Sequence, residues 1–228
     1  MVSCQRPQDF FPLREDVALA PGALRGKLAL VTGGGTGIGK GIARTFAKLG
    51  AQVIILSRRL DVLNETAIEL SKGVELAVVP MQLDVRKPET ISAVLDEIEK
   101  RFNRLPNIVV NNAAGNFMMA TERLSDNAFR TVNDIVFFGT LYVTMEVGRR
   151  IIRQQKDGCA FLAISADYAR FGGPFTVPSS ISKAGIENLY KSLSAEWGKY
   201  GMRFNIITPG PVATRGAFGQ LSGKPIFA

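Results

Sequence analysis

Thr32-Gly33-Gly34-Gly35-Thr36-Gly37-Ile38-Gly39 is the stretch that best predicts the fold of this chain. An apolar run, residues 27–32, leads into it, and a helical pattern of apolar residues that ends at Gly50 follows it. Its T-G-x-x-x-G-x-G spacing leaves out side chains where backbone N–H groups must approach a pyrophosphate. Strand, turn and helix occur in the required order, so we expect a dinucleotide-binding turn; a flexible surface turn is the alternative. The expected contacts are Gly33, Gly35, Thr36, Gly37, Ile38 and Gly39.

Five further apolar runs follow, and amphipathic stretches separate most of them. They are residues 52–57, 76–83, 107–111, 160–165 and 203–208. Runs that are apolar without alternation suit strands that are buried on both faces of a sheet. The pattern therefore predicts an α/β fold, a doubly wound parallel sheet (Rossmann fold) with helices on both faces.

The length of 228 residues, without a linker or an internal repeat, predicts one domain. We expect residues 1–26 to form an N-terminal arm and residues 27–228 to form an NADP-binding Rossmann domain. Residues 213–228 are too few for a crossover of about a dozen residues and a further strand. We therefore expect the last crossover and the seventh strand to be missing, which leaves the sixth strand as an exposed edge. On its own the chain is expected to be poorly soluble or marginally stable, and inactive on the substrate that the resemblance below implies.

The composition excludes several kinds of site. The chain has no histidine, which excludes Ser-His-Asp catalysis and His-ligated zinc, and its two cysteines make no disulfide framework and no metal site. Charged or polar residues interrupt every run before the roughly 20 apolar residues of a membrane helix, so we expect a soluble protein without a membrane partner. The net charge of +8 would suit nucleic acid, but the cations are scattered apart from short pairs such as residues 58–59 and 149–150. We expect no nucleic-acid partner; small polyphosphates or a basic solvated surface would account for the charge.

The end of the second run predicts the choice of cofactor. Ser57 and Arg58 stand about where an acidic residue would hold the adenosine ribose of NAD. A guanidinium there favours the extra phosphate of NADP, and the serine hydroxyl can donate to it, so we expect NADPH. In the alternative, Arg58 and Arg59 are solvated and Asp61 binds the ribose, although we expect Asp61 in the following helix.

Further motifs follow in order: Leu83-Asp84-Val85, the run 111–117, Ser179-x-x-x-Lys183 and the run 209–212. Together with the glycine turn, they resemble those of the short-chain dehydrogenase/reductase superfamily over nearly all of the chain beyond Gly26. Within that superfamily, residues 112–117, 121–125 and 195–205 are similar to the 2,4-dienoyl-CoA reductases of the mitochondrial type.

One position departs from the common pattern of the superfamily. A tyrosine is usual four residues before the lysine, and here that position is Ser179. The nearest upstream tyrosine is Tyr168, just after the fifth run, and this shift is similar to the dienoyl-CoA reductases. The resemblance implies that Lys183 binds the nicotinamide ribose, while Tyr168 and Asn116 face the substrate thioester. Alternatives stay open: Tyr168 as a ring stacked on the sheet edge, and Ser179 as a local donor or as a helix-start residue.

The resemblance supplies the reaction. It implies an NADPH-dependent 2,4-dienoyl-CoA reductase of unsaturated fatty acid β-oxidation, with an acyl-CoA substrate and a 3-enoyl-CoA product. Hydride reaches the far carbon of the conjugated thioester, and donors at the thioester oxygen stabilise the dienolate. Ser179 is a far weaker acid than a phenol, so ordinary ketone chemistry is less expected. The alternatives are a truncated, non-catalytic dinucleotide-binding remnant and a carbonyl-reducing short-chain dehydrogenase.

The resemblance implies further contacts, an assembly and a compartment. For acyl-CoA the contacts are Arg86, Phe117 and Ser125; for the cofactor they are Asp84, Asn112, Pro209, Gly210, Pro211 and Val212. The complete form is expected to be a homo-oligomer, a tetramer, and the mitochondrial matrix is the expected compartment. The acidic residues among the first 26 are wrong for a transit peptide, so the cytoplasm is the alternative.

Overall fold

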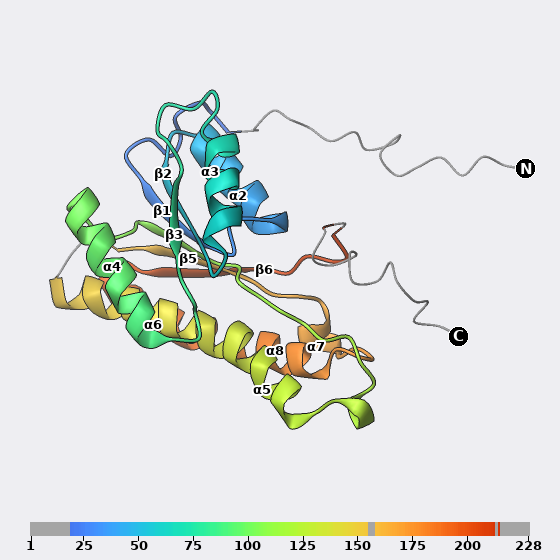
Figure 1. Cartoon of the computed structure of the whole chain (residues 1–228). Coiled ribbons are helices and arrows are strands. Elements are labelled where there is room, and N and C mark those ends of the chain that lie inside the picture. The colour runs from blue at the N-terminus through green and yellow to red at the C-terminus, as the bar shows by residue number, and fades with distance from the viewer. Residues whose placement is uncertain (1–18, 155–157, 213, 215–228) are drawn as a thin grey trace, which may run out of the picture.

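The apolar runs form six parallel strands of one sheet in the computed structural model, which describes residues 19–154, 158–212 and 214 (Figure 1). The strand order is β3-β2-β1-β4-β5-β6. The strands are β1 (Leu28–Thr32), β2 (Gln52–Ser57), β3 (Val79–Gln82), β4 (Ile108–Asn111), β5 (Ala160–Ile164) and β6 (Arg203–Ile207). The prediction of a doubly wound parallel sheet is therefore confirmed.

The third strand is shorter than the predicted run 76–83. Its pairing with β2 begins at Val79, opposite Ile54. The preceding amide, of Val78, donates instead to the hydroxyl of Ser71 at 2.9 Å, which holds this segment against the end of a helix rather than in the sheet.

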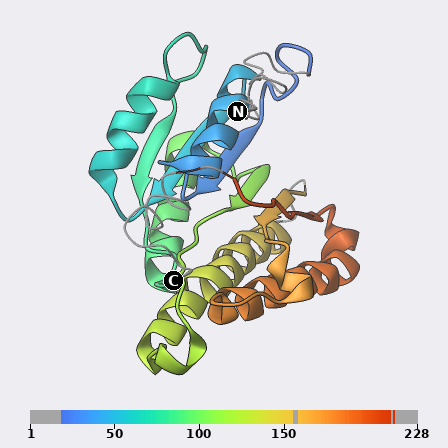
Figure 2. The same ribbon diagram turned by 90° about the vertical axis from the view of Figure 1, so that its right-hand side faces the viewer.

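Helices cover both faces of the sheet (Figure 1, Figure 2). On one face lie α2 (Gly37–Lys48) and α3 (Leu60–Leu70). On the other lie α4 (Pro88–Phe102), α6 (Gly139–Gln154) and α8 (Val177–Trp197), together with η1 (Thr121–Arg123), α5 (Asp126–Asn133), the π-helical turn η2 (Asp134–Phe138), α7 (Tyr168–Phe171) and η3 (Gly198–Tyr200). In the described ranges, no helix combines the length and the apolarity needed to cross a membrane.

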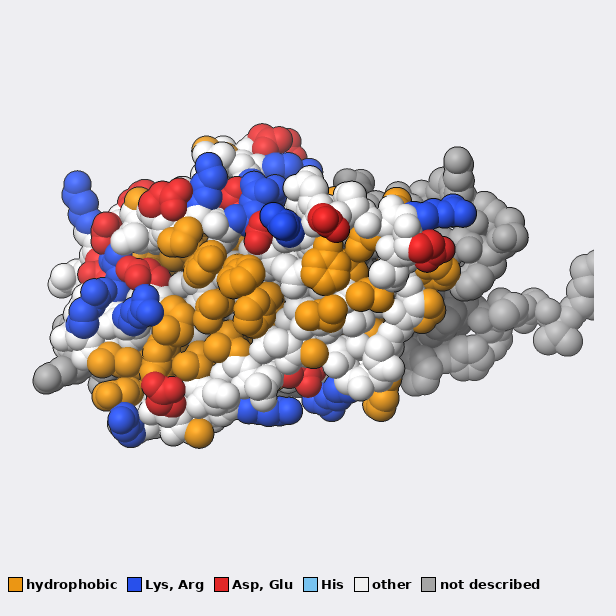
Figure 3. Space-filling model, turned by 90° about the horizontal axis from the view of Figure 1, so that it is seen from below, with side chains coloured by type: hydrophobic (Ala, Val, Ile, Leu, Met, Phe, Trp, Pro, Cys, Tyr) orange, Lys and Arg blue, Asp and Glu red, His pale blue; other side chains and the backbone are white. Residues whose placement is uncertain are grey.

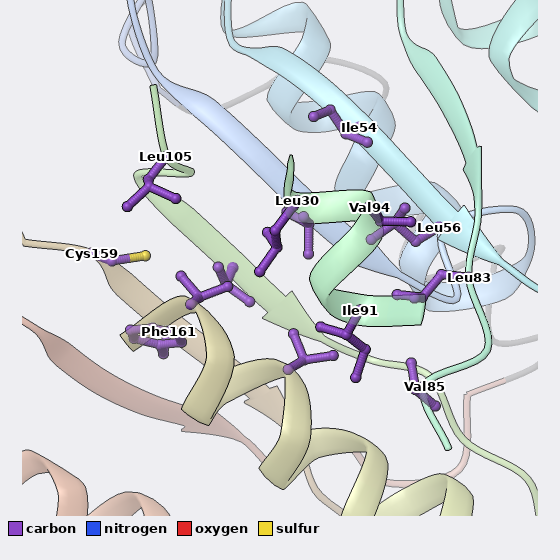
Figure 4. Close-up of a cluster of buried hydrophobic side chains, with 14 of the residues drawn as sticks. Leu30, Ile54, Leu56, Leu83, Val85, Ile91, Val94, Leu105, Cys159 and Phe161 are labelled. Carbon is purple, nitrogen blue, oxygen red and sulfur yellow. The ribbon is translucent and has the colours of Figure 1, made fainter. Parts of the chain in front are cut away.

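Alternate residues of the central strands pack in two separate hydrophobic cores, one on each face of the sheet. Leu28 and Leu30 of β1 belong to the core under α4, α6 and α8, part of which is drawn in Figure 4. Ala29 and Val31 belong to the core under α2 and α3. All four side chains are 0–1% exposed, as expected for a strand buried on both faces.

Helix α6 is fixed to both of its neighbours. A Cβ on Gly148 would lie 2.2 Å from the ring of Trp197, so only glycine lets α8 approach this closely. The buried guanidinium of Arg150 pairs with Asp96 at 2.6 Å and with Glu99 at 3.3 Å, both on α4. Its charge is therefore used inside the domain.

Candidate active site

The glycine turn between β1 and α2 leaves backbone N–H groups open. Gly33 and Gly37 have φ angles of +66° and +54°, which side chains rarely adopt. A Cβ on Gly39 would lie 2.4 Å from the carbonyl oxygen of Gly33. Thr36, the N-cap of α2, makes no side-chain hydrogen bond to the helix. The first turn of α2 therefore offers its N–H groups, and its dipole, to an anion, which fits a dinucleotide pyrophosphate.

Asn112 and Thr32 brace this turn. The amide of Asn112 donates to the carbonyl oxygens of Thr32 at 2.9 Å and Gly33 at 3.2 Å. The hydroxyl of Thr32 accepts from the backbone N–H groups of Asn112 and Ala113, both at 3.0 Å. The side chain of Asn112, predicted to contact the cofactor, thus ties β4 to the turn. Sequence reasoning missed this role of Thr32. A polar residue at the end of an otherwise apolar strand was the signal that could have indicated it.

A cleft of about 180 Å³ lies at the carboxyl ends of the strands, where ligands bind in doubly wound sheets. Six of the predicted cofactor contacts line it: Gly33, Gly35, Thr36, Ser57, Arg58 and Asp84. A larger depression, of about 540 Å³, lies between α3 and β3. The hydroxyl of Ser71, which lines that depression, already donates to the carbonyl oxygen of Ala67 and accepts from the Val78 amide. The cleft, and not the depression, therefore carries the candidate site.

Asp84, which lines the cleft, forms an ion pair with Arg86. The Nε atom of Arg86 lies 2.9 Å and 3.1 Å from the two carboxylate oxygens. The hydrogen bond from Arg86 holds the pKa of Asp84 below its usual value, and the charge of Arg58 contributes. Sequence reasoning assigned Asp84 to the cofactor and Arg86 to acyl-CoA. The structure brings the two side chains together, and of the two only Asp84 lines the cleft.

Tyr168, Ser179 and Lys183 gather at the far end of β5. The hydroxyl groups of Tyr168 and Ser179 lie 3.0 Å apart. Lys183, one turn beyond Ser179 on α8, donates to the carbonyl oxygen of Ile164, the last residue of β5. Burial lowers the pKa of Lys183 to about 8. The shift of tyrosine from α8 to α7 thus keeps its hydroxyl beside the helix that carries the lysine.

Asn116 stands in the loop after β4. Among the described residues, no donor reaches its buried amide oxygen. A buried polar atom without a partner has a desolvation cost, which a ligand group or solvent would relieve. That oxygen is an acceptor, whereas the role predicted for Asn116 is to donate, so that role stays a prediction.

Several other predicted contacts lie outside the lining of the cleft. Phe117 is 46% exposed. Ser125 is the N-cap of α5, where its hydroxyl accepts from the Ala128 amide at 3.2 Å. Residues 209–212 follow β6, and Thr214 lies above the glycine turn, since a Cβ on Gly37 would be 3.5 Å from its side chain. Thr214 therefore lies close to the first residue of α2.

The sequence pattern shared by the short chain dehydrogenase family matches residues 27–220 of this chain. The chain belongs to the short-chain dehydrogenase family. Its members use NAD or NADP, and the open N-terminus of α2 and the cleft beside it fit such a cofactor. This match identifies the family; it does not distinguish the mitochondrial type of dienoyl-CoA reductase from other members.

Individual proteins of known name are similar to this chain over most of its length. An "uncharacterized oxidoreductase" of Caenorhabditis elegans is 56% identical over 221 residues, which cover 97% of this chain and 70% of that protein. A "probable 2,4-dienoyl-CoA reductase [(3E)-enoyl-CoA-producing]" of the same organism is 52% identical, with 97% and 71% covered. The crystal structure of a short chain dehydrogenase from Bacillus anthracis has a TM-score of 0.79 and 37% identity, and the match covers 83% of this chain and 75% of that one. This short-chain dehydrogenase is thus an oxidoreductase by family, closely related to probable dienoyl-CoA reductases.

Proposed function

We propose that this short-chain dehydrogenase is an NADPH-dependent 2,4-dienoyl-CoA reductase that produces a 3-enoyl-CoA. The observation that carries the proposal is the 3.0 Å contact between the hydroxyls of Tyr168 and Ser179. It places a phenol beside the lysine helix although the usual tyrosine position is occupied by serine. The similarity to proteins named as probable dienoyl-CoA reductases supports the same conclusion.

In this reaction, each residue of the site has a separate chemical role. NADPH supplies the hydride. Tyr168 and the amide of Asn116 donate to the thioester oxygen, where negative charge collects in the dienolate, an effect of roughly 3–4 kcal/mol for one well-placed donor. Tyr168 then gives or relays a proton to the carbon next to the thioester. Lys183 binds the nicotinamide ribose from its buried position at the end of β5.

Arg58 supports NADPH rather than NADH. It is exposed, lines the cleft and lies at the start of the segment between β2 and α3. A guanidinium in this place can form charge-assisted hydrogen bonds with the ribose phosphate that only NADP carries. Asp61, the alternative ribose ligand, lies in the first turn of α3.

The test is cofactor oxidation with three substrates: a 2,4-dienoyl-CoA, a 2-enoyl-CoA and a simple ketone. We expect NADPH consumption with the dienoyl-CoA alone, and a product whose double bond lies between carbons 3 and 4. Turnover of the ketone instead would support a carbonyl-reducing dehydrogenase. Binding of NADPH without turnover of any substrate would support the non-catalytic remnant.

We also propose that the protein is a tetramer in the mitochondrial matrix, as the resemblance implies. On the side of α4, α6 and α8, apolar side chains gather across the middle of the surface with charges along its edge (Figure 3). Phe138 of η2 is 37% exposed and stacks on Tyr142 of α6, with ring centroids 5.9 Å apart. Such an apolar surface suits a subunit contact. Sedimentation equilibrium and cell fractionation test the two statements.

A further inference from the structure

Glu187 is a buried acid on α8 whose two carboxylate oxygens have different partners. The residue is 5% exposed. The hydroxyl of Ser165 donates to one oxygen at 2.8 Å, and the guanidinium of Arg170 donates to the other at 3.1 Å. Sequence reasoning did not single out any of the three.

The two partners lie on the elements that carry the reactive groups. Ser165 directly follows Ile164, whose carbonyl oxygen accepts from Lys183. Glu187 is one helical turn beyond Lys183, so two residues of α8, a turn apart, bind two consecutive residues at the end of β5. Arg170 belongs to α7, the helix that begins with Tyr168.

Helix α7 depends on such polar ties for its position. It has four residues, none of which is buried, and Phe171 at its end is 87% exposed. An element that buries little apolar surface opens easily unless other contacts hold it. In the described structure the Tyr168–Ser179 contact and the Arg170–Glu187 ion pair join α7 to α8.

The carboxylate is ionised at neutral pH although it is buried. Burial raises the pKa of Glu187, but hydrogen bonds from Ser165 and Arg170 outweigh burial and bring it below its ordinary value. Burying a charge is costly unless it is paired and hydrogen-bonded, and removal of one partner leaves the other uncompensated. Glu187 is therefore tuned to two specific partners rather than tolerated by its surroundings.

We propose that Glu187 is a positioning residue: its carboxylate clamps α7 and the end of β5 onto α8, and so holds the Tyr168 hydroxyl and Lys183 in register. This inference rests on the proposed function, in which Tyr168 is the acid. Glu187 itself touches neither substrate nor cofactor. It acts through Arg170 on one side and Ser165 on the other.

The test compares Glu187→Gln with Glu196→Gln in the full chain. Glutamine keeps the shape and the bond to Ser165 but removes the ion pair to Arg170. Glu196 lies on the same helix, is exposed, and undergoes the same change of charge. The measurements are kcat, KM for a dienoyl-CoA, the Kd for NADPH, the melting temperature, and hydrogen–deuterium exchange of the peptide that contains residues 166–173.

Glu187→Gln should lower kcat about tenfold and speed exchange in that peptide, with the Kd for NADPH within about twofold of the parent. Glu196→Gln should change none of these. Arg170 is exposed, so its variants fold in either case: Arg170→Gln should reproduce the loss, and Arg170→Lys should restore part of kcat because it keeps the charge.

Two results would overturn the inference. One is unchanged kcat and exchange in Glu187→Gln. The other is a parallel loss of kcat, cofactor binding and melting temperature with no rescue by Arg170→Lys, which would make Glu187 a general part of the scaffold. If the parent protein reduces no dienoyl-CoA, the proposed function fails by itself. Kinetics then use whichever substrate is turned over, and exchange alone decides whether Glu187 holds α7.

Discussion

The hydroxyl groups of Tyr168 and Ser179 lie 3.0 Å apart although the residues belong to different helices. A phenol has an ordinary pKa of about 10, far below that of an aliphatic hydroxyl, so the phenol is the acid of the pair. The buried Ser179 fixes the direction of the phenol. The serine at the usual tyrosine position is therefore the partner of the tyrosine that has moved to α7.

Cofactor choice should follow Arg58. Removing its guanidinium in Arg58→Ala should weaken NADPH binding about tenfold or more, the equivalent of the roughly 1.5–3 kcal/mol of a charged hydrogen bond. NADH binding should change little, because NADH lacks the ribose phosphate. Fluorescence titration with both cofactors checks this, and an equal loss for both would contradict the assignment.

The glycine turn should not accept a methyl group at Gly39. A Cβ there would lie 2.4 Å from both the Gly33 carbonyl oxygen and the Asn112 amide nitrogen, so the turn would have to shift. Gly39→Ala should weaken binding of either cofactor and lower the free energy of unfolding by roughly 1–3 kcal/mol. Gly41→Ala is the control on the same helix, because a Cβ there meets nothing within 4 Å and should stabilise by about 0.5–1 kcal/mol. Urea denaturation that ranks the two variants alike would show that the close approach does not constrain the turn.

Lys183 should make stability depend on pH. Burial lowers its pKa from 10.5 to about 8, so between pH 8 and 10 the unfolded chain binds more protons than the folded one. The contribution of Lys183 to the free energy of unfolding therefore rises with pH across this window. Below pH 8 both states are protonated, and the cost of burying the cation is fully present.

Lys183→Met removes this dependence. Without cofactor, the free energy of unfolding of the parent minus that of the variant should rise by on the order of 2 kcal/mol from pH 7 to 9.5. The buried Cys159 and Tyr190, whose pKa values burial raises, occur in both proteins and cancel in the difference. A difference that stays flat with pH would show that Lys183 keeps its ordinary pKa in the folded protein.

The sheet could be read from the sequence because each strand is a continuous apolar run. Five of the six runs match their strands to within a residue at either end. The exception, β3, begins late because the Val78 amide binds Ser71, a contact between side chain and backbone that leaves no apolar signal. The glycine turn was also readable, since its spacing is imposed by the backbone itself.

Contacts between side chains from separate elements were not readable. The Ser165–Glu187–Arg170 cluster joins three segments, and only the helical spacing of Glu187 after Lys183 hints at it. The ligand contacts predicted for Asn112 and Ser125 stay predictions, because both side chains already bind the protein itself. Such polar side chains hydrogen-bond to nearby backbone at caps and turns, so a polar residue beside a site need not touch a ligand.

The measurement that tests the central claim most directly is turnover of a 2,4-dienoyl-CoA by Tyr168→Phe. Phenylalanine keeps the ring and removes only the hydroxyl that donates to the thioester oxygen. We predict that kcat falls by about two orders of magnitude or more, with the Kd for NADPH unchanged. Ser179→Ala, which leaves the phenol in place, should lower kcat less. Full activity of Tyr168→Phe together with a larger loss in Ser179→Ala would contradict the account and return the acid to α8.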